Sequence, residues 1–337
     1  MNKLAMFADG FIDEQWSLVS SRTSQTEVNL INKMTGFTDR ITAAGSGGVG
    51  IELIKKRTVQ GGFVANIGCA AASLGVDTTM VGLFGESSLH PVFEYCKTLA
   101  KVISIGDPSV THVLEFDDGK ILMSDMAAVL GVNWQLITNR VHNLKEILTE
   151  ASVIGMGYWS LIPSFDEIIE GMCALIPNDG KERRFFFDFA DIKKRDEASL
   201  KTTLNLLKKS KIPVTLSVNE HEGAIIFDLF GKNFEPENTE AVRQELEFDE
   251  LVIHTPHYAS AASKKYGQAI VPQEYVEKPV RTAGAGDTFN GGYIAASLTG
   301  KTMIERLKFA NAAVTFFLVK GTHPNEEDVR AYRGSLK

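Results

Sequence analysis

A run of small residues that ends in a carboxylate is the sharpest chemical signal in the chain: residues 282–287 read TAGAGD and precede a helical pattern over 288–298. Glycines at the start of a helix let a ligand approach free backbone N–H groups and the positive end of the helix dipole, which predicts an anion site. Asp287 stands where a carboxylate can take the proton of an attacking hydroxyl while the N–H groups stabilise a transferring phosphoryl group. The alternative is an aspartate that only caps the helix.

A second pattern suits the binding of a sugar. Gly61 and Gly62 let the backbone come close to a ligand, and Asn66 offers one hydrogen-bond donor and one acceptor group to a sugar hydroxyl. The alternative is a glycine turn before a tightly packed, alanine-rich helix that ends near Gly75.

A third pattern suits magnesium. Asn219 and Glu222 follow the strand-like run 213–218, and ligands of open α/β sheets bind where the strands end. The side-chain oxygens of these two residues are of the kind that magnesium and its waters prefer. The alternative is helix capping by Asn219.

These residues need a scaffold, and short apolar runs that alternate with helical patterns predict one. The strand-like runs are 4–8, 79–83, 152–156, 185–187, 213–218 and 251–254, and the helical stretches include 165–176, 197–209 and 304–319. This alternation predicts an α/β fold with a central, mostly parallel sheet and helices on both faces.

Three further stretches alternate in polarity or are β-branched without a following helix: 16–22, 51–59 and 111–123. They predict a small antiparallel sheet that stands apart from the main one and would serve as a lid. The glycine-rich segment 43–50 is interpreted as a mobile loop between lid elements.

The composition favours small-molecule chemistry. The 337 residues are 44% hydrophobic and 23% charged, which suits one large folded domain with a smaller appendage. A formal net charge of -7 disfavours nucleic acid and anionic membranes as partners, and three distant cysteines disfavour a disulfide framework or a thiolate metal site. No signal peptide and no membrane-spanning stretch is expected, which predicts a cytoplasmic protein.

Together, the Gly-Gly-x-x-x-Asn, Asn-x-x-Glu and Gly-Ala-Gly-Asp patterns resemble the PfkB carbohydrate kinase family, the ribokinase-like sugar kinases, in the same order and over nearly the whole chain. The resemblance implies one ribokinase-like kinase domain over residues 1–337, with lid elements drawn from about 14–60 and 110–125. It also implies transfer of phosphate from ATP, with Mg²⁺, to a hydroxyl of a small sugar-like substrate, and a homodimer formed through the lid.

The resemblance further implies a role for each matching residue. The catalytic group, a base and its anion hole, would be Asp287 with Gly284, Ala285 and Gly286. The sugar-binding group would be Asp13, Gly61, Gly62 and Asn66. The nucleotide-binding group would be Asn219, Thr255, Gly284 and Gly286. The residue that organises magnesium would be Glu222.

Arg281 departs from the family pattern, because many members carry an aspartate there that helps to hold a monovalent cation beside the anion hole. A guanidinium cannot ligate a cation but could replace its charge, so this protein is predicted not to need potassium. Thr255 is followed by Pro256 and His257 where the family usually has glycines. Phe63 stands where some members carry lysine, so the identity of the sugar stays open.

Three alternatives compete with a sugar kinase. Residues 45–50 read GSGGVG and fit the dinucleotide fingerprint GxGxxG, but no convincing strand precedes them and no acidic residue follows at the required distance, which disfavours a dehydrogenase. A catalytically idle relative that senses a sugar or nucleotide is disfavoured because Asp287 and Glu222 are retained. A nucleoside kinase of the same fold stays open, since Trp16 and Phe116 in the lid would be able to stack on a base.

Overall fold

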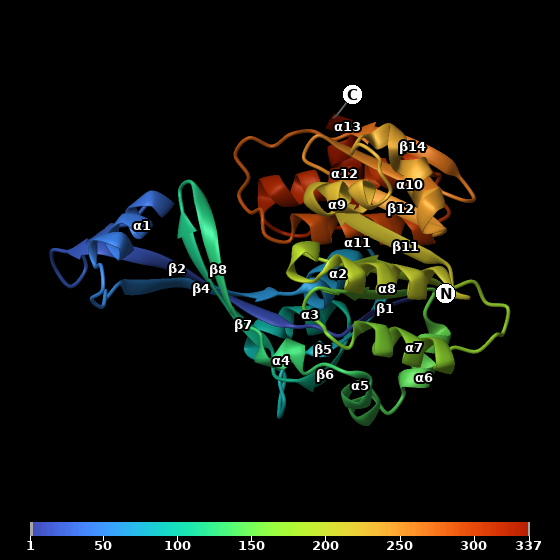
Figure 1. The fold of residues 1–337 in the computed structure, drawn as a ribbon, viewed down its shortest axis with the longest axis horizontal. Helices are drawn as coiled ribbons and strands as arrows, with labels where there is room; N and C mark the ends of the chain where they lie inside the picture. The colour runs from blue at the N-terminus through green and yellow to red at the C-terminus, as the bar shows by residue number, and fades with distance from the viewer. Residues whose placement is uncertain (1–2, 336–337) are drawn as a thin grey trace.

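A central sheet of nine strands organises the described part of the chain, residues 3–335 of a computed structural model (Figure 1). From one edge to the other the strands are β14 (Gly267–Pro272), β13 (Tyr258–Ser263), β12 (Glu250–His254), β11 (Val214–Asn219), β10 (Arg184–Asp188), β9 (Val153–Gly157), β1 (Lys3–Phe7), β5 (Asp77–Leu83) and β6 (Lys101–Gly106). The strands from β12 to β6 run parallel, and the β13–β14 edge is antiparallel.

The predicted α/β fold with a mostly parallel central sheet is confirmed. Each of the six predicted strands falls on one of these strands, because a parallel strand that is covered on both faces is a continuous apolar run. β9, for example, is buried along its whole length. β13 carries no such signal, since small alanines and serines fill it.

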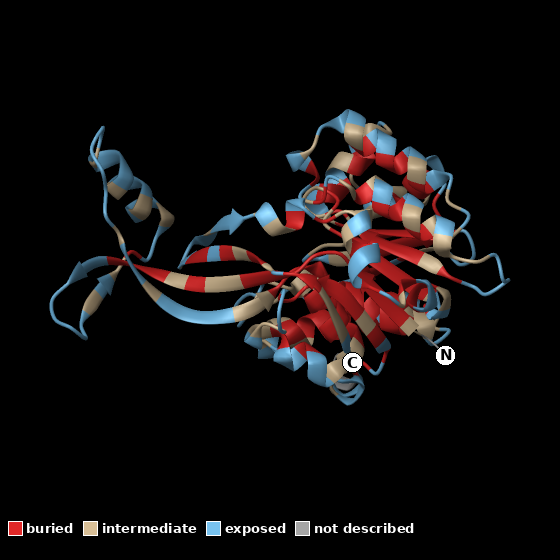
Figure 2. Ribbon diagram, turned by 90° about the horizontal axis from the view of Figure 1, so that it is seen from below, coloured by how far each residue is buried: buried red, intermediate tan, exposed pale blue. Residues whose placement is uncertain are grey.

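Helices cover both faces of the sheet, as predicted. One face packs against α4 (Ala127–Leu130), α5 (Trp134–Arg140), α6 (Leu144–Glu150), α7 (Phe165–Leu175), α8 (Glu197–Lys208), α9 (Glu220–Leu229) and α10 (Thr239–Leu246). The other packs against α2 (Phe63–Ser73), α3 (Glu94–Leu99), α11 (Ala285–Leu298), α12 (Met303–Lys320) and α13 (Glu326–Ser335). Figure 2 shows the buried residues concentrated where these layers meet. None of the described helices is both long and apolar enough to cross a membrane.

A second sheet projects from the body at the place predicted for the lid (Figure 1). Its strands are β2 (Phe11–Arg22), β3 (Val28–Leu30), β4 (Glu52–Gly61), β7 (Ser109–Phe116) and β8 (Gly119–Asp125). The prediction of a purely antiparallel lid is wrong, because β2 and β7 pair in parallel. Both strands leave the carboxyl-terminal edge of the main sheet, β2 after β1 and β7 after β6, and therefore run outward in the same direction.

The far end of the lid carries α1 (Met34–Ala43), a helix that the sequence pattern does not predict. None of its residues is buried, although Met34, Phe37 and Ile41 recur at helical spacing and Phe37 packs beside the small lid cluster of Leu18, Ile31 and Leu114. Asp118, in the turn between β7 and β8, anchors it by accepting the backbone N–H of Met34 at 2.9 Å. The glycine-rich loop follows α1 and leads to β4, so its predicted place between lid elements is confirmed.

Candidate active site

A cavity of about 390 Å³ lies under the lid, beside the edge of the main sheet where the parallel strands end. Ligands of open α/β sheets bind at this edge. The predicted site residues that meet in its lining are Asp13, Gly62, Asn66, Gly284 and Asp287. The predicted residues that lie outside its lining are Gly61, Ala285, Gly286, Asn219, Glu222 and Thr255.

The amino-terminal end of α11 borders this cavity with unpaired backbone donors. Gly284 has a φ of 89°, a left-handed conformation that turns the chain into the helix. The backbone N–H groups of Gly286 and Asp287 have no hydrogen-bond partner within residues 3–335, as the first turn of a helix leaves them. Together with the helix dipole they favour the predicted anion site.

Asp287 is held at this helix end by Asn66 of α2, whose Nδ2 donates to Asp287 Oδ2 at 2.8 Å. Burial and the neighbouring Asp188 carboxylate raise the pKa of Asp287 to about 8, although the Asn66 hydrogen bond opposes them. Asn66 Oδ1 is buried and has no partner among the described residues. A carboxyl group with a pKa near neutrality and a free acceptor beside it would suit the deprotonation of a bound hydroxyl.

Asp13 on β2 contributes a second carboxyl group to the cavity. A Cβ atom at Gly61 would lie 2.7 Å from Asp13 Oδ1, so a larger residue there would displace this side chain. Burial raises the pKa of Asp13 to about 6, and the positive charges of Arg281 and Lys120 oppose the rise. Near neutral pH Asp13 is therefore largely ionised and can accept hydrogen bonds from hydroxyl groups.

Gly62 makes room for a different carboxylate, that of Asp9. The φ of Gly62 is 92°, and a Cβ atom there would lie 2.4 Å from Asp9 Oδ2. Asp9 is fully buried and accepts the backbone N–H groups of Phe63 at 2.7 Å and Val64 at 3.0 Å. These contacts fix the start of α2. Since α2 carries Asn66, Asp9 positions the residue that holds Asp287.

Asn219 and Glu222 form a capping box at the start of α9. Asn219 Oδ1 accepts the backbone N–H of Glu222 at 3.1 Å, and Glu222 Oε2 accepts that of Asn219 at 3.2 Å. The capping alternative for Asn219 is therefore present in the structure. Its contact with a nucleotide stays a prediction.

Glu222 nevertheless stands in a carboxylate-rich environment that suits a cation. Burial and the charge of Asp188 raise the pKa of Glu222 to about 9. Asp188, at the end of β10, accepts a hydrogen bond from Asn290 Nδ2 at 2.8 Å, and burial raises its pKa to about 6. Within the described residues no three His, Cys, Asp or Glu side chains could hold a metal alone. A cation would stabilise the buried carboxyl groups of Glu222 and Asp188, which would fit a magnesium ion that phosphates and water also coordinate.

Thr255 closes the turn between β12 and β13. Its Oγ1 accepts the backbone N–H groups of His257 at 3.1 Å and Tyr258 at 3.0 Å. Such a hydroxyl-closed turn is a sufficient structural reason for threonine at this position. The contact of Thr255 with a nucleotide stays a prediction.

Sequence reasoning missed two residues of the site, Asp9 and Tyr158. Asp9 follows the end of β1, and Tyr158 directly follows β9 and lines the cavity with a φ of 57°. Burial and the carboxylates around it, Asp287 first, raise the pKa of the Tyr158 phenol, so it stays a neutral donor. The strand-end rule that singled out Asn219 would have found both residues.

A buried carboxyl group at a helix end with unpaired N–H groups, beside a cavity under a lid, is the geometry expected of a small-molecule kinase. A family model described as prokaryotic ketohexokinase matches residues 2–335. The chain belongs to this family of carbohydrate kinases. The prediction of a PfkB-type, ribokinase-like sugar kinase is thereby confirmed.

One curated relative is similar in sequence, and solved structures are similar in fold. A ketohexokinase of Haloferax volcanii is 26% identical, over 96% of this chain and 88% of the relative. A putative ribokinase II from E. coli, in complex with ATP and Mg²⁺, shares the fold with a TM-score of 0.69 at 14% identity, over 99% of this chain and 100% of its own. An Arabidopsis thaliana ribokinase complexed with ribose and ATP has a TM-score of 0.70 at 17% identity, over 98% of each chain.

The raised pKa of Asp287 predicts a pH dependence. The carboxylate is the active form of the base, and its fraction grows as pH rises through about 8. The kcat/KM for the sugar is therefore expected to climb with pH and to level off above that value. A profile of kcat/KM from about pH 5.5 to about pH 9.5 measures this, and a flat profile would contradict the role of Asp287.

Proposed function

We propose that this protein is a ketohexokinase that transfers the γ-phosphoryl group of ATP, with Mg²⁺, to a hydroxyl of a ketohexose. The match of the prokaryotic ketohexokinase model to residues 2–335 carries the substrate class. The site supports the transfer, since Asp13, Asn66 and Asp287 line one cavity. A buried carboxyl group with a raised pKa, such as that of Asp287, is typical of catalytic sites, which disfavours the catalytically idle alternative.

In the proposed mechanism the sugar lies under the lid with one hydroxyl between Asn66 and Asp287. The free Oδ1 of Asn66 and the ionised Asp13 accept hydrogen bonds from sugar hydroxyls. Asp287 takes the proton of the attacking hydroxyl, while the unpaired N–H groups of α11 stabilise charge on the transferred phosphoryl group. Magnesium, held by Glu222 when bound, would neutralise phosphate charge. The lid excludes water from the transfer.

Arg281 supplies positive charge beside this transfer. Its guanidinium carbon lies 5.2 Å from the ring centroid of Phe317, and its Nε is buried with no partner among the described residues. The side chain lines the cavity, and its charge opposes the rise in the pKa of both Asp13 and Asp287. The guanidinium thus takes the place of a monovalent cation beside the anion hole.

The lid is also the proposed surface for a homodimer. Among the described strands, β4 and β8 each pair with one neighbour and leave one edge open. Leu53, Leu122 and Met123 on these strands are 43%, 58% and 55% exposed, which favours contact with a second copy. Sedimentation of the purified protein tests the homodimer, and a monomer would contradict it.

The cytoplasmic location stays a prediction.

The substrate proposal predicts a ranking of acceptors. D-fructose is expected to give a kcat/KM roughly tenfold or more above that of D-ribose, D-glucose or adenosine at one Mg·ATP concentration, because a site with fixed polar groups rejects substrates that leave them unpaired. Coupled ADP release measures the ranking, and ³¹P NMR of the product locates the new phosphate ester. Preference for ribose or adenosine would reject the ketohexose. If none of the acceptors causes ADP release although a sugar binds, the result would favour the catalytically idle alternative.

The role of Arg281 predicts independence from potassium. Exchange of potassium for choline is expected to leave turnover unchanged, because the guanidinium already supplies the charge. Arg281→Ala is expected to lower kcat on the order of 10²–10³-fold, whereas Arg281→Lys, which keeps the charge, recovers part of the loss. Steady-state assays of the native protein and both variants, in potassium and in choline salts, measure these effects. Strong activation of the native protein by potassium would contradict this role.

A further inference from the structure

A second cavity, of about 1190 Å³, lies at the opposite edge of the main sheet, where β10, β11 and β12 begin. Arg184 and Glu250, the first residues of β10 and β12, line it. The same strands end on the side of the active site. The two cavities share no lining residue and are therefore separate sites.

The lining of this second cavity is basic, although the chain as a whole is acidic. Eight lysine and arginine residues and five aspartate and glutamate residues line it, while the whole chain has a formal net charge of -7. Lys209, Lys211 and Lys265 are exposed at its rim and have no acidic partner within the described residues. A concave surface with clustered positive charge attracts small anions.

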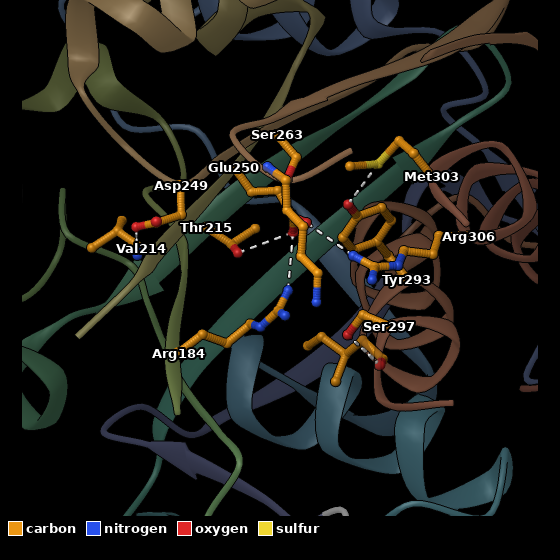
Figure 3. Close-up of polar contacts among 12 residues, drawn as sticks. Arg184, Val214, Thr215, Asp249, Glu250, Ser263, Tyr293, Ser297, Met303 and Arg306 are labelled. Atoms are coloured by element: carbon orange, nitrogen blue, oxygen red, sulfur yellow. Dashed lines mark hydrogen bonds and ion pairs between the residues drawn. The ribbon is translucent and has the colours of Figure 1, made fainter. Parts of the chain in front are cut away.

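The floor of the cavity keeps a positive charge as well. Glu250 is buried and joins two arginines: Oε1 accepts from Arg306 at 2.9 Å and Oε2 from Arg184 at 3.2 Å (Figure 3). Thr215 Oγ1 donates to the same carboxylate at 3.2 Å. Two guanidinium groups against one carboxylate leave a surplus of positive charge, and Arg306 is only 1% exposed. Desolvated charge of one sign is stabilised by a bound ion of the other.

Arg183 adds a buried donor that the protein itself does not use. Its terminal nitrogens bind Asp179 at 2.6 and 2.8 Å, but its Nε is buried and has no partner among the described residues. Tyr266 forms part of the wall, with its ring centroid 4.6 Å from the guanidinium carbon of Arg306. A spare donor beside surplus cations suits a ligand that accepts several hydrogen bonds.

We propose that this basic cavity binds a phosphorylated metabolite. A phosphate monoester carries close to two negative charges and three acceptor oxygens, which match surplus cations and a spare donor better than a single carboxylate does. The volume is large for a small-molecule site and leaves room for the sugar or nucleoside that carries the phosphate. Inorganic phosphate, a sugar phosphate and a nucleotide share this chemistry, and binding experiments distinguish them.

Calorimetric titration of the full-length protein with inorganic phosphate, fructose 6-phosphate and AMP tests the proposal. Lys209→Glu/Lys211→Glu removes two rim cations of the cavity. Lys145→Glu/Lys308→Glu makes the same change of net charge at two exposed lysines outside it. All three proteins keep the same active site, so any binding there is the same in each. A difference in affinity between the two variants therefore measures binding in the basic cavity.

At least one of the three probes is expected to bind the native protein and the Lys145/Lys308 variant alike, and the Lys209/Lys211 variant roughly tenfold or more weakly. The probe that binds most tightly identifies the source of the phosphate. Equal affinities in all three proteins, or no binding of any probe to the native protein, would overturn the proposal. Equal thermal unfolding of the variants excludes misfolding, and Lys265→Ser removes a third rim cation independently.

Discussion

The close approach of α2 and α11 is the constraint on which the active site depends. A Cβ atom at Gly291 would lie 2.6 Å from Ala70 Cβ, so these helices pack at a distance that only small residues allow. On the other side of α11, a Cβ atom at Gly292 would lie 3.1 Å from Ala310 Cα of α12. Held between its two neighbours, α11 presents Asp287 within hydrogen-bond distance of Asn66. The motif residues meet because glycine and alanine bring their helices together.

Charge is distributed unevenly along the strands of the main sheet. Buried carboxyl groups with raised pKa values, Asp188 and Asp287 among them, gather where the parallel strands end. Arginines gather where the strands begin, around Glu250. Burial of like charges costs free energy in the folded state, and a ligand of the opposite sign offsets that cost. The two edges therefore favour ligands of opposite charge, a cation where the strands end and an anion where they begin.

Much of the fold follows from the sequence, and the exceptions have physical reasons. Parallel strands are read as apolar runs because both of their faces are buried. The parallel pairing of β2 with β7 joins segments that are distant in the chain, and no local pattern encodes it. The helix α1 has only three large apolar residues at helical spacing, Met34, Phe37 and Ile41, and the glycine-rich segment that follows it favoured the interpretation of a loop.

The prediction of the site rests on local sequence patterns only in part. The short segment that contains Asp287 and its glycines predicts a helix end that binds an anion, because the whole pattern lies in a few consecutive residues. Asn66 was singled out by the glycines before it and Asp13 by a resemblance, and their place in the same cavity arises only from packing. Asp9 and Tyr158 each follow a strand, which places them at this edge of the sheet, but no local signal assigns a role to either. Asn219 shows the opposite case, because a residue singled out for a ligand also caps a helix.

The most direct test of the account is phosphoryl transfer by Asp287→Asn. Asparagine keeps the shape of the side chain and removes the proton acceptor, so the account predicts that kcat with D-fructose falls on the order of 10²–10⁴-fold. The dissociation constant of fructose, measured by titration on the same protein, should change by less than about threefold. A kcat within about tenfold of the native value, with fructose binding intact, would show that Asp287 is not the base.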